Sequence, residues 1–232
     1  MSENIKKITK AFKIDLDSRE NQSIILKPSA RPFNNQAHQV NEAAKKIYEL
    51  IKDAKHSNDD IILNHNKIKE AFFSPFKPQL KNAQVFLSHS HADKNKALKV
   101  KNYLESETNH RVFIDSLFWD YKDNVLNKLA KYDNTSKIKD AFVLILRESL
   151  QDMIEKCPYF VFLQSNNSVS NQGLSRITYS AWIYEELKIA HSIRESRPTL
   201  MVESIQVFHD ISPFLENLET ITLKELSQQI NS

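Results

Sequence analysis

Two short apolar runs separated by an amphipathic segment set the strongest limit on how this chain folds. Val85-Phe86-Leu87 is followed by the polar run Ser88-His89-Ser90-His91-Ala92-Asp93, and Val112-Phe113-Ile114 is followed by Asp115. The spacing between the runs is helical, so the pattern predicts a strand, a polar loop, a helix and a second strand. Ligands of open parallel sheets bind at the carboxyl ends of the strands. We therefore expect functional residues in the polar loop and at Asp115.

Strand and helix patterns continue to alternate after this stretch. The strands predicted for this part of the chain are 85–87, 111–115, 159–163 and 199–202, and the helices are 93–106, 137–157 and 181–194. Residues 141–146 could instead form a strand, and residues 164–179 are predicted to be a polar loop. Such alternation is typical of an α/β fold with a central parallel sheet and flanking helices.

The run Ser74-Pro75-Phe76-Lys77-Pro78 interrupts the helical spacing ahead of the first strand. Before it, residues 1–33 are predicted to form a loosely packed arm, and residues 35–54 and 58–73 are predicted to form helices. The expected organisation is an arm and helical hairpin over 1–78, an α/β domain over 82–205, and a C-terminal helical segment over 206–232 packed on that domain.

The shortage of glycine excludes the common nucleotide-binding motifs. Gly173 is the only glycine in 232 residues, where average usage would give about 16. A dinucleotide fingerprint needs three glycines and a P-loop needs two, so neither can be written here. Turns that require a positive φ must therefore be formed mostly by Asn and Asp.

Charge and cysteine content limit the partners and the compartment. The net charge is +3, with Lys and Glu interleaved, which favours solvated helix surfaces over a nucleic-acid-binding track. No apolar run approaches the ~20 residues of a membrane span, and the N-terminus lacks the apolar core of a secretory signal. Cys157 is the only cysteine, which suits a reducing cytoplasm and is expected to be a buried, inert thiol.

The polar loop contains a possible metal motif, His89-x-His91-x-Asp93. Two histidines and a carboxylate after a strand could bind zinc, as in metallo-β-lactamase-fold hydrolases. Lys94 stands where that pattern continues with another histidine, and its ammonium group disfavours a cation. A zinc-dependent hydrolase is the least favoured hypothesis, and we expect no metal.

Three motifs in order resemble a bacterial Toll/interleukin-1 receptor (TIR) domain over residues 82–205. They are VFLSHSHADK from Val85, VFID from Val112, and Ser180-Ala181-Trp182-Ile183-Tyr184-Glu185-Glu186-Leu187. The resemblance implies a flavodoxin-like fold and cleavage of the nicotinamide–ribose bond of NAD⁺. The product would be ADP-ribose or a cyclic isomer, and NAD⁺ would be a substrate rather than a cofactor. It also implies antiviral defence of the Thoeris type.

The resemblance assigns the essential glutamate to Glu186. Trp182 and Glu186 are four residues apart and share a helix face, whereas Glu185 points about 100° away. A lone carboxylate suits this chemistry, because departure of neutral nicotinamide leaves an oxocarbenium-like ribose and needs no acid.

The candidate substrate-binding residues are assigned on two different grounds, the resemblance and nearness to the end of a strand. Phe86, Ser88, His89 and Trp182 are carried over by the resemblance, and Trp119 is a stacking candidate only through its nearness to the strand end. Asp115 is either structural or substrate-facing, and Asp93 is expected to cap the next helix.

The alternative to an enzyme is a non-catalytic TIR module that binds other TIR domains. In either case we expect self-association, and a separate effector or phage-sensing partner. The loop after Asp115 has no glycine, unlike the usual TIR loop that governs assembly and access.

Overall fold

The computed structural model describes residues 10–27, 37–53, 55–57, 60–62, 64–73, 82–130, 136–172, 175–192 and 209–232. The chain forms two compact units. Unit 1 contains residues 1–32, 83–115 and 150–232, and unit 2 contains residues 33–82 and 116–149.

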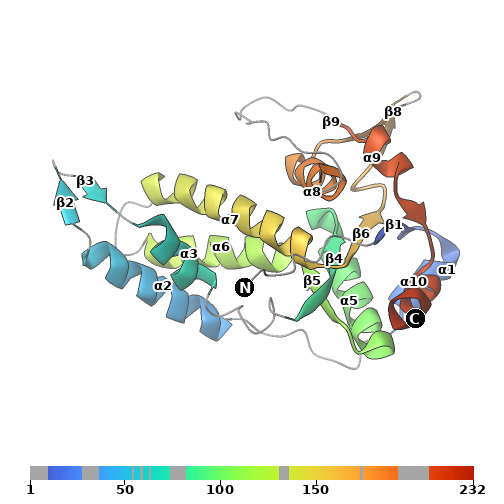
Figure 1. The fold of residues 1–232 in the computed structure, drawn as a ribbon, viewed down its shortest axis with the longest axis horizontal. Coiled ribbons are helices and arrows are strands. Elements are labelled where there is room, and N and C mark those ends of the chain that lie inside the picture. Colours follow the sequence, from blue (N-terminus) through green and yellow to red (C-terminus); the bar gives the residue numbers. More distant parts are fainter. Residues whose placement is uncertain are drawn as a thin grey trace, which may run out of the picture. The chain divides into compact units, whose positions relative to one another are not determined.

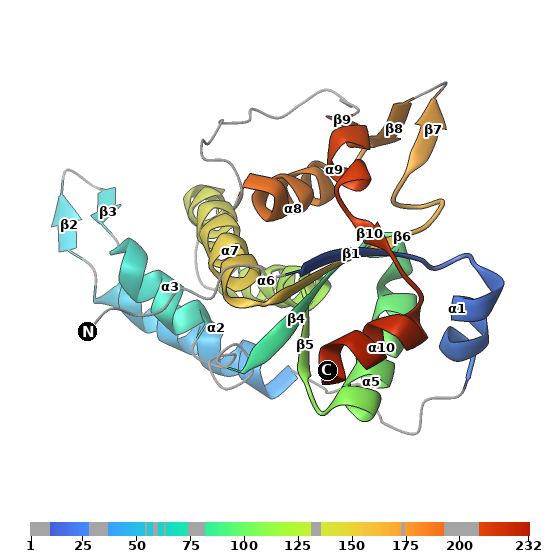
Figure 2. The ribbon, with the colours of Figure 1, turned by 45° about the vertical axis from the view of Figure 1, so that its right-hand side comes forward.

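Unit 1 is built on a five-stranded parallel sheet (Figure 1). Its strands, in spatial order, are β10 (Glu219–Thr220), β1 (Lys10–Asp15), β6 (Tyr159–Gln164), β4 (Ala83–Ser88) and β5 (Arg111–Ile114). Figure 2 shows α5 (Lys94–Thr108) and α10 (Leu223–Asn231) on one side of this sheet and α8 (Ala181–Ser192) on the other. The predicted α/β class, with a central parallel sheet and flanking helices, is confirmed.

Strand β1 comes from the segment that was predicted to be a loose arm, and for these residues that prediction is wrong. All six residues of β1 pair with β6, and Phe12 and Lys13 also pair with β10. Phe12 and Ile14 alternate on one face and are fully buried. This strand has only two strongly apolar positions among charged ones, so its pattern is weak without its partner. The strand predicted at 199–202 lies outside the described residues.

The link from β4 to β5 follows the predicted order. A short 3₁₀ turn, η2 (His91–Asp93), leads into α5, which ends at Asn109. Asn109 has a φ of 53° and ends the helix in the left-handed conformation. Asn tolerates this conformation better than most residues, so the expectation that Asn replaces glycine at such turns is confirmed here.

Two C-terminal predictions need correction. The predicted polar loop over 164–179 contains a hairpin of β7 (Ser170–Gln172) and β8 (Ser175–Thr178), and β8 also pairs with β9 (His209–Asp210). The segment predicted to be helical over 206–232 contains α9 (Ser212–Glu216) and α10, but also the strand β10, which belongs to the five-stranded sheet.

Unit 2 is mainly helical. Its elements are α2 (Ala37–Lys52), the hairpin β2 (Lys55–Ser57) and β3 (Asp60–Ile62), α3 (His65–Phe73), α6 (Ser116–Leu129) and residues 136–149 of α7 (Ser136–Lys156). Helix α2 packs against α3 and α6, and the Tyr121 hydroxyl donates to the Phe72 carbonyl at 3.1 Å.

These elements confirm a helix over 137–156 and correct two other predictions. For residues 116–134 the sequence predicts a loop with a short helix over 125–132, whereas residues 116–129 form one helix. Residues 60–62, within the helix predicted over 58–73, form the strand β3. The helical hairpin expected within 1–78 belongs to the same unit as α6 and most of α7. No helix in the described ranges is both long enough and apolar enough to cross a membrane.

Candidate functional site

Polar side chains gather where β4 and β5 end. Ser88 is the last residue of β4, His89 follows it, and Asp115 follows β5; all three are buried. Because β4 and β5 are parallel neighbours, their carboxyl ends lie at the same edge of the sheet. The edge predicted to carry function therefore contains three buried polar residues.

Helix α8 adds a carboxyl group to this edge. Ser180 directly precedes the helix, and its side chain accepts a hydrogen bond from the Ile183 amide at 3.3 Å. Its buried stripe then follows helical spacing at Ile183, Glu186, Leu187 and Ala190. An ionisable residue thus occupies a position where an apolar side chain would be expected, and Glu186 is 0% exposed.

Four side chains form what we call the buried polar cluster: Ser88, His89, Asp115 and Glu186. The Ser88 hydroxyl donates to Glu186 Oε2, and Asp115 lies close enough to Glu186 for its charge to raise the pKa of the Glu186 carboxyl group. His89 Nδ1 lies 3.2 Å from Asp115 Oδ1, an ion pair when the imidazole is protonated. Within the described part of the chain, His89 Nε2 has no hydrogen-bond partner. All four belong to unit 1.

The surroundings of Glu186 favour its neutral form. Burial raises the pKa of Glu186 well above its ordinary value of 4.5, and the charge and hydrogen bond of Asp115 raise this pKa further. The hydrogen bond from Ser88 acts in the opposite direction and lowers the pKa. A strongly perturbed carboxyl group at a sheet edge is a common property of functional sites.

The raised pKa of Glu186 predicts a specific pH dependence of stability. The folded protein holds this proton more tightly than the unfolded chain, so its stabilisation is complete below about pH 4.5 and is lost as the pH rises through the folded-state pKa. Between these limits, one proton corresponds to about 1.4 kcal/mol per pH unit. Urea unfolding at several pH values should show this slope in the wild type and not in Glu186→Gln. Equal slopes in the two proteins would contradict the assignment.

The other predicted site residues lie apart from the cluster or are not described. Phe86 is fully buried, and its ring packs on Phe113 and Phe160 at centroid distances of 5.5 and 5.8 Å. It shares the face of β4 with Ser88, which lies two residues later in the strand, and its ring lies in the core of unit 1. Trp182 is partly exposed, one turn before Glu186. Trp119 lies in α6, but its side chain is outside the described part.

The residues of the possible zinc motif diverge. His89 lies against Asp115, which follows β5, and His91 is exposed. Asp93 instead contacts Ser165, which follows β6, the neighbour of β4 on its other side. Across the described side chains, no group of three His, Cys, Asp or Glu residues could hold a metal ion.

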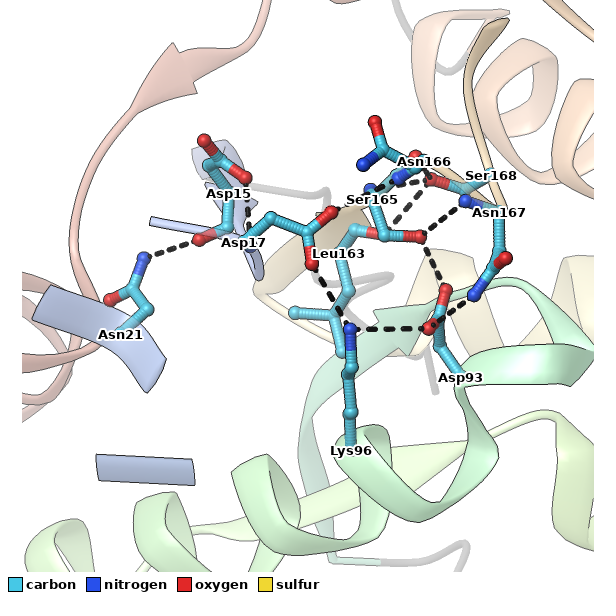
Figure 3. Close-up of polar contacts among 10 residues, drawn as sticks. All are labelled: Asp15, Asp17, Asn21, Asp93, Lys96, Leu163, Ser165, Asn166, Asn167 and Ser168. Atoms are coloured by element: carbon cyan, nitrogen blue, oxygen red, sulfur yellow. Dashed lines mark hydrogen bonds and ion pairs between the residues drawn. The ribbon is translucent and has the colours of Figure 1, made fainter. Parts of the chain in front are cut away.

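Asp93 belongs to a second group of polar contacts (Figure 3). It stands at the N-cap position of α5 without capping it, which corrects the predicted role. Its carboxylate accepts hydrogen bonds from the Ser165 hydroxyl and from Asn167 Nδ2, the latter at 2.9 Å. Lys96 Nζ lies 3.7 Å from Asp93 and 3.1 Å from Asp17. The network joins the segments that follow β1, β4 and β6.

The roles of Asp17, Lys96, Ser165 and Asn167 in this network were not predicted from the sequence. The run Ser165-Asn166-Asn167-Ser168 directly follows β6 and was an available signal, because such residues favour loops with side-chain hydrogen bonds. Their shared partner, Asp93, is 72 residues from Ser165 in the sequence, so the pairing itself could not be inferred.

Replacing Asp93 with Ala is expected to destabilise the protein by about 1–3 kcal/mol, because the buried Ser165 hydroxyl and the Asn167 amide lose their acceptor. Urea unfolding measures the change. His91→Ala is the matched control, since its side chain is exposed two residues earlier and should leave stability nearly unchanged. Equal stability of the two variants would show that the network contributes nothing.

Cys157 is fully buried, and burial raises the pKa of its thiol to about 12. This confirms the expectation of an inert thiol, because the reactive thiolate is not populated at neutral pH.

Comparison with known proteins found no matching family model, curated protein or solved structure.

Proposed function

We propose that this protein is an NAD⁺ nucleosidase that cleaves the nicotinamide–ribose bond, with Glu186 as the catalytic carboxylate. The observation that carries the proposal is the burial of Glu186 against Ser88 and Asp115 at the carboxyl edge of a parallel sheet. The motif resemblance independently selects the same glutamate. The product is ADP-ribose or a cyclic isomer that serves as a signal in cytoplasmic antiviral defence.

The reaction needs a stabilising anion more than an acid. When the bond between ribose C1′ and the pyridinium nitrogen breaks, its electron pair moves to that nitrogen, and nicotinamide leaves uncharged. Positive charge develops on the ribose, where Glu186 stabilises it once its carboxyl group has lost its proton to solvent. Water then bonds to C1′ and gives up a proton, yielding ADP-ribose; attack by another part of the same nucleotide yields the cyclic product. Ser88 orients the Glu186 carboxylate because its hydroxyl group donates a hydrogen bond to Glu186 Oε2.

The energetic cost of the cluster argues against a purely structural role. Two carboxyl groups and an imidazole are removed from water, and His89 Nε2 finds no hydrogen bond within the described ranges. Apolar residues of similar volume commonly stabilise such positions equally well or better. A scaffold that only binds other TIR domains has no need of this arrangement, so the enzyme is the better-supported function.

Access to Glu186 requires a conformational change. Its side chain has no exposed surface, so NAD⁺ reaches it only after covering groups move. A closed resting site fits an enzyme that becomes active on self-association, and the closure protects the cell from unregulated NAD⁺ loss.

The test is incubation of the full chain with NAD⁺ over a range of protein concentrations, with chromatography of the products. We expect nicotinamide release that rises more steeply than in proportion to protein concentration. Mass spectrometry then identifies the linear or cyclic product. Absence of release at every concentration, together with association of the chain, would favour the non-catalytic module.

A further inference from the structure

The imidazole ring of His89 is a buried basic group with no part in breaking the nicotinamide–ribose bond. Its side chain has 0% exposed surface, and its Nδ1 atom lies 3.2 Å from Asp115 Oδ1. Within the described part of the chain, its Nε2 atom has no hydrogen-bond partner. Buried polar atoms almost always have partners, so an unpartnered ring nitrogen in a candidate active site points to a group that acts on a bound molecule.

The chain places this ring beside the reacting groups. His89 directly follows Ser88, the last residue of β4, whose hydroxyl donates to Glu186 Oε2. Asp115 directly follows β5, the parallel neighbour of β4, so both residues lie at the same edge of the sheet. The contact between His89 and Asp115 has the distance of an ion pair but not the alignment of a hydrogen bond. Such imperfect alignment is common in active sites before the substrate binds.

Transfer of the ribosyl group to an acceptor requires a base for some acceptors and not for others. A hydroxyl group, whether of water or of the nucleotide itself, must lose its proton when its oxygen bonds to C1′. A pyridine-type ring nitrogen attacks with a free lone pair and has no proton to lose. A base in the site therefore favours hydroxyl acceptors over ring nitrogens. Imidazole is the side chain most often found in this role.

We infer that His89 is a catalytic residue: it is the general base that takes the proton of a hydroxyl acceptor, and it thereby directs the reaction to hydroxyl groups rather than to ring nitrogens. This inference rests on the proposed function. The acceptor oxygen forms its bond to C1′ with a lone pair, and its proton moves to His89 Nε2. The imidazolium ion then lies beside the Asp115 carboxylate, as in other sites where a carboxylate orients and stabilises a catalytic imidazole. The proton passes to solvent as the product leaves.

The experiment follows two acceptors in one reaction. The full chain is incubated with NAD⁺ and isotopically labelled nicotinamide, whose concentration is raised until labelled NAD⁺ is measurable in the wild type. Linear or cyclic ADP-ribose reports attack by a hydroxyl group, whereas labelled NAD⁺ reports attack by the ring nitrogen of nicotinamide. Chromatography with mass spectrometry measures both products. Their ratio describes the acceptor step alone and does not depend on the amount of folded protein.

The variant is His89→Asn, which keeps an N–H group near the position of Nδ1 and removes Nε2. We expect the ratio of ADP-ribose to labelled NAD⁺ to fall about a hundredfold, the lower end of what a positioned base contributes, while labelled NAD⁺ still forms. His91→Asn is the matched control, because it makes the same substitution on an exposed side chain two residues later. The ratio of this control is expected to equal that of the wild type.

A second measurement uses only the wild type. Transfer of a deuteron to the base is slower than transfer of a proton, whereas attack by nicotinamide transfers neither. We therefore expect a lower ratio of ADP-ribose to labelled NAD⁺ in heavy water than in ordinary water. This measurement decides the inference if His89→Asn does not fold.

The outcomes separate the inference from the proposed function. An unchanged ratio in folded His89→Asn, including equal loss of both products, overturns the inference and leaves the nucleosidase proposal intact. An unchanged ratio of the wild type in heavy water has the same consequence. Absence of both products from the wild type at every protein concentration overturns the proposed function and the inference together.

Discussion

Replacing Glu186 with Gln is expected to reduce nicotinamide release from NAD⁺ by about a hundredfold to a thousandfold. Gln has the shape of the protonated Glu186 side chain and still accepts the Ser88 hydrogen bond, but it cannot become an anion. Loss of one group that stabilises transition-state charge typically costs this much in turnover. Initial rates of nicotinamide release, measured by chromatography at saturating NAD⁺, give the comparison.

The matched control is Glu185→Gln, which removes the same charge one residue earlier on α8. Glu185 is partly exposed, whereas Glu186 is fully buried. We expect Glu185→Gln to retain activity within about threefold of the wild type, as is usual for a change outside the reacting site. Equal loss in both variants, or full activity in Glu186→Gln with an unchanged melting temperature, would refute the catalytic assignment.

Replacing Phe12 with Ala is expected to destabilise the protein by about 3–5 kcal/mol, the range for deleting a fully buried aromatic side chain. Phe12 is 0% exposed and lies in β1, which pairs with β6 on one side and β10 on the other. Many domains have only about 5–15 kcal/mol of stability, so this single change removes a large share. Urea unfolding, followed by the far-ultraviolet signal, measures it.

Leu26→Ala serves as the control, because Leu26 lies in the same N-terminal segment and is 71% exposed. Its expected cost is within about 0.5 kcal/mol. A loosely packed arm would make both substitutions equally mild. That result would remove β1 from the folded core and with it the strand order described above.

Local patterns in the sequence were sufficient for the elements that surround the site. The strands β4, β5 and β6 and the helices α5 and α8 were all predicted, because their apolar spacing is strong over the length of each element. Helical geometry also separated Glu186 from Glu185 without any structure. These features depend on neighbours a few residues away, which a sequence displays directly.

Long-range pairing lay beyond those patterns. Strand β1 is stabilised by hydrogen bonds to β6, which begins about 150 residues later in the chain. The apolar pattern of β1 alone is too weak to predict a strand. Asp93 is a residue type that commonly caps helices, but its carboxylate accepts hydrogen bonds from Ser165 and Asn167 instead of from the first backbone amides of α5. In both cases the deciding partner is distant in the chain.

The α/β class, the sheet edge with polar residues and the candidate glutamate could all be predicted from residue types and their spacing. The burial of Glu186, the influence of Asp115 on its pKa and the position of His89 against Asp115 became visible only in the folded chain. The reason is physical: residue type and periodicity are local properties, whereas the protonation of a carboxyl group depends on burial and on charges that folding brings within a few ångströms.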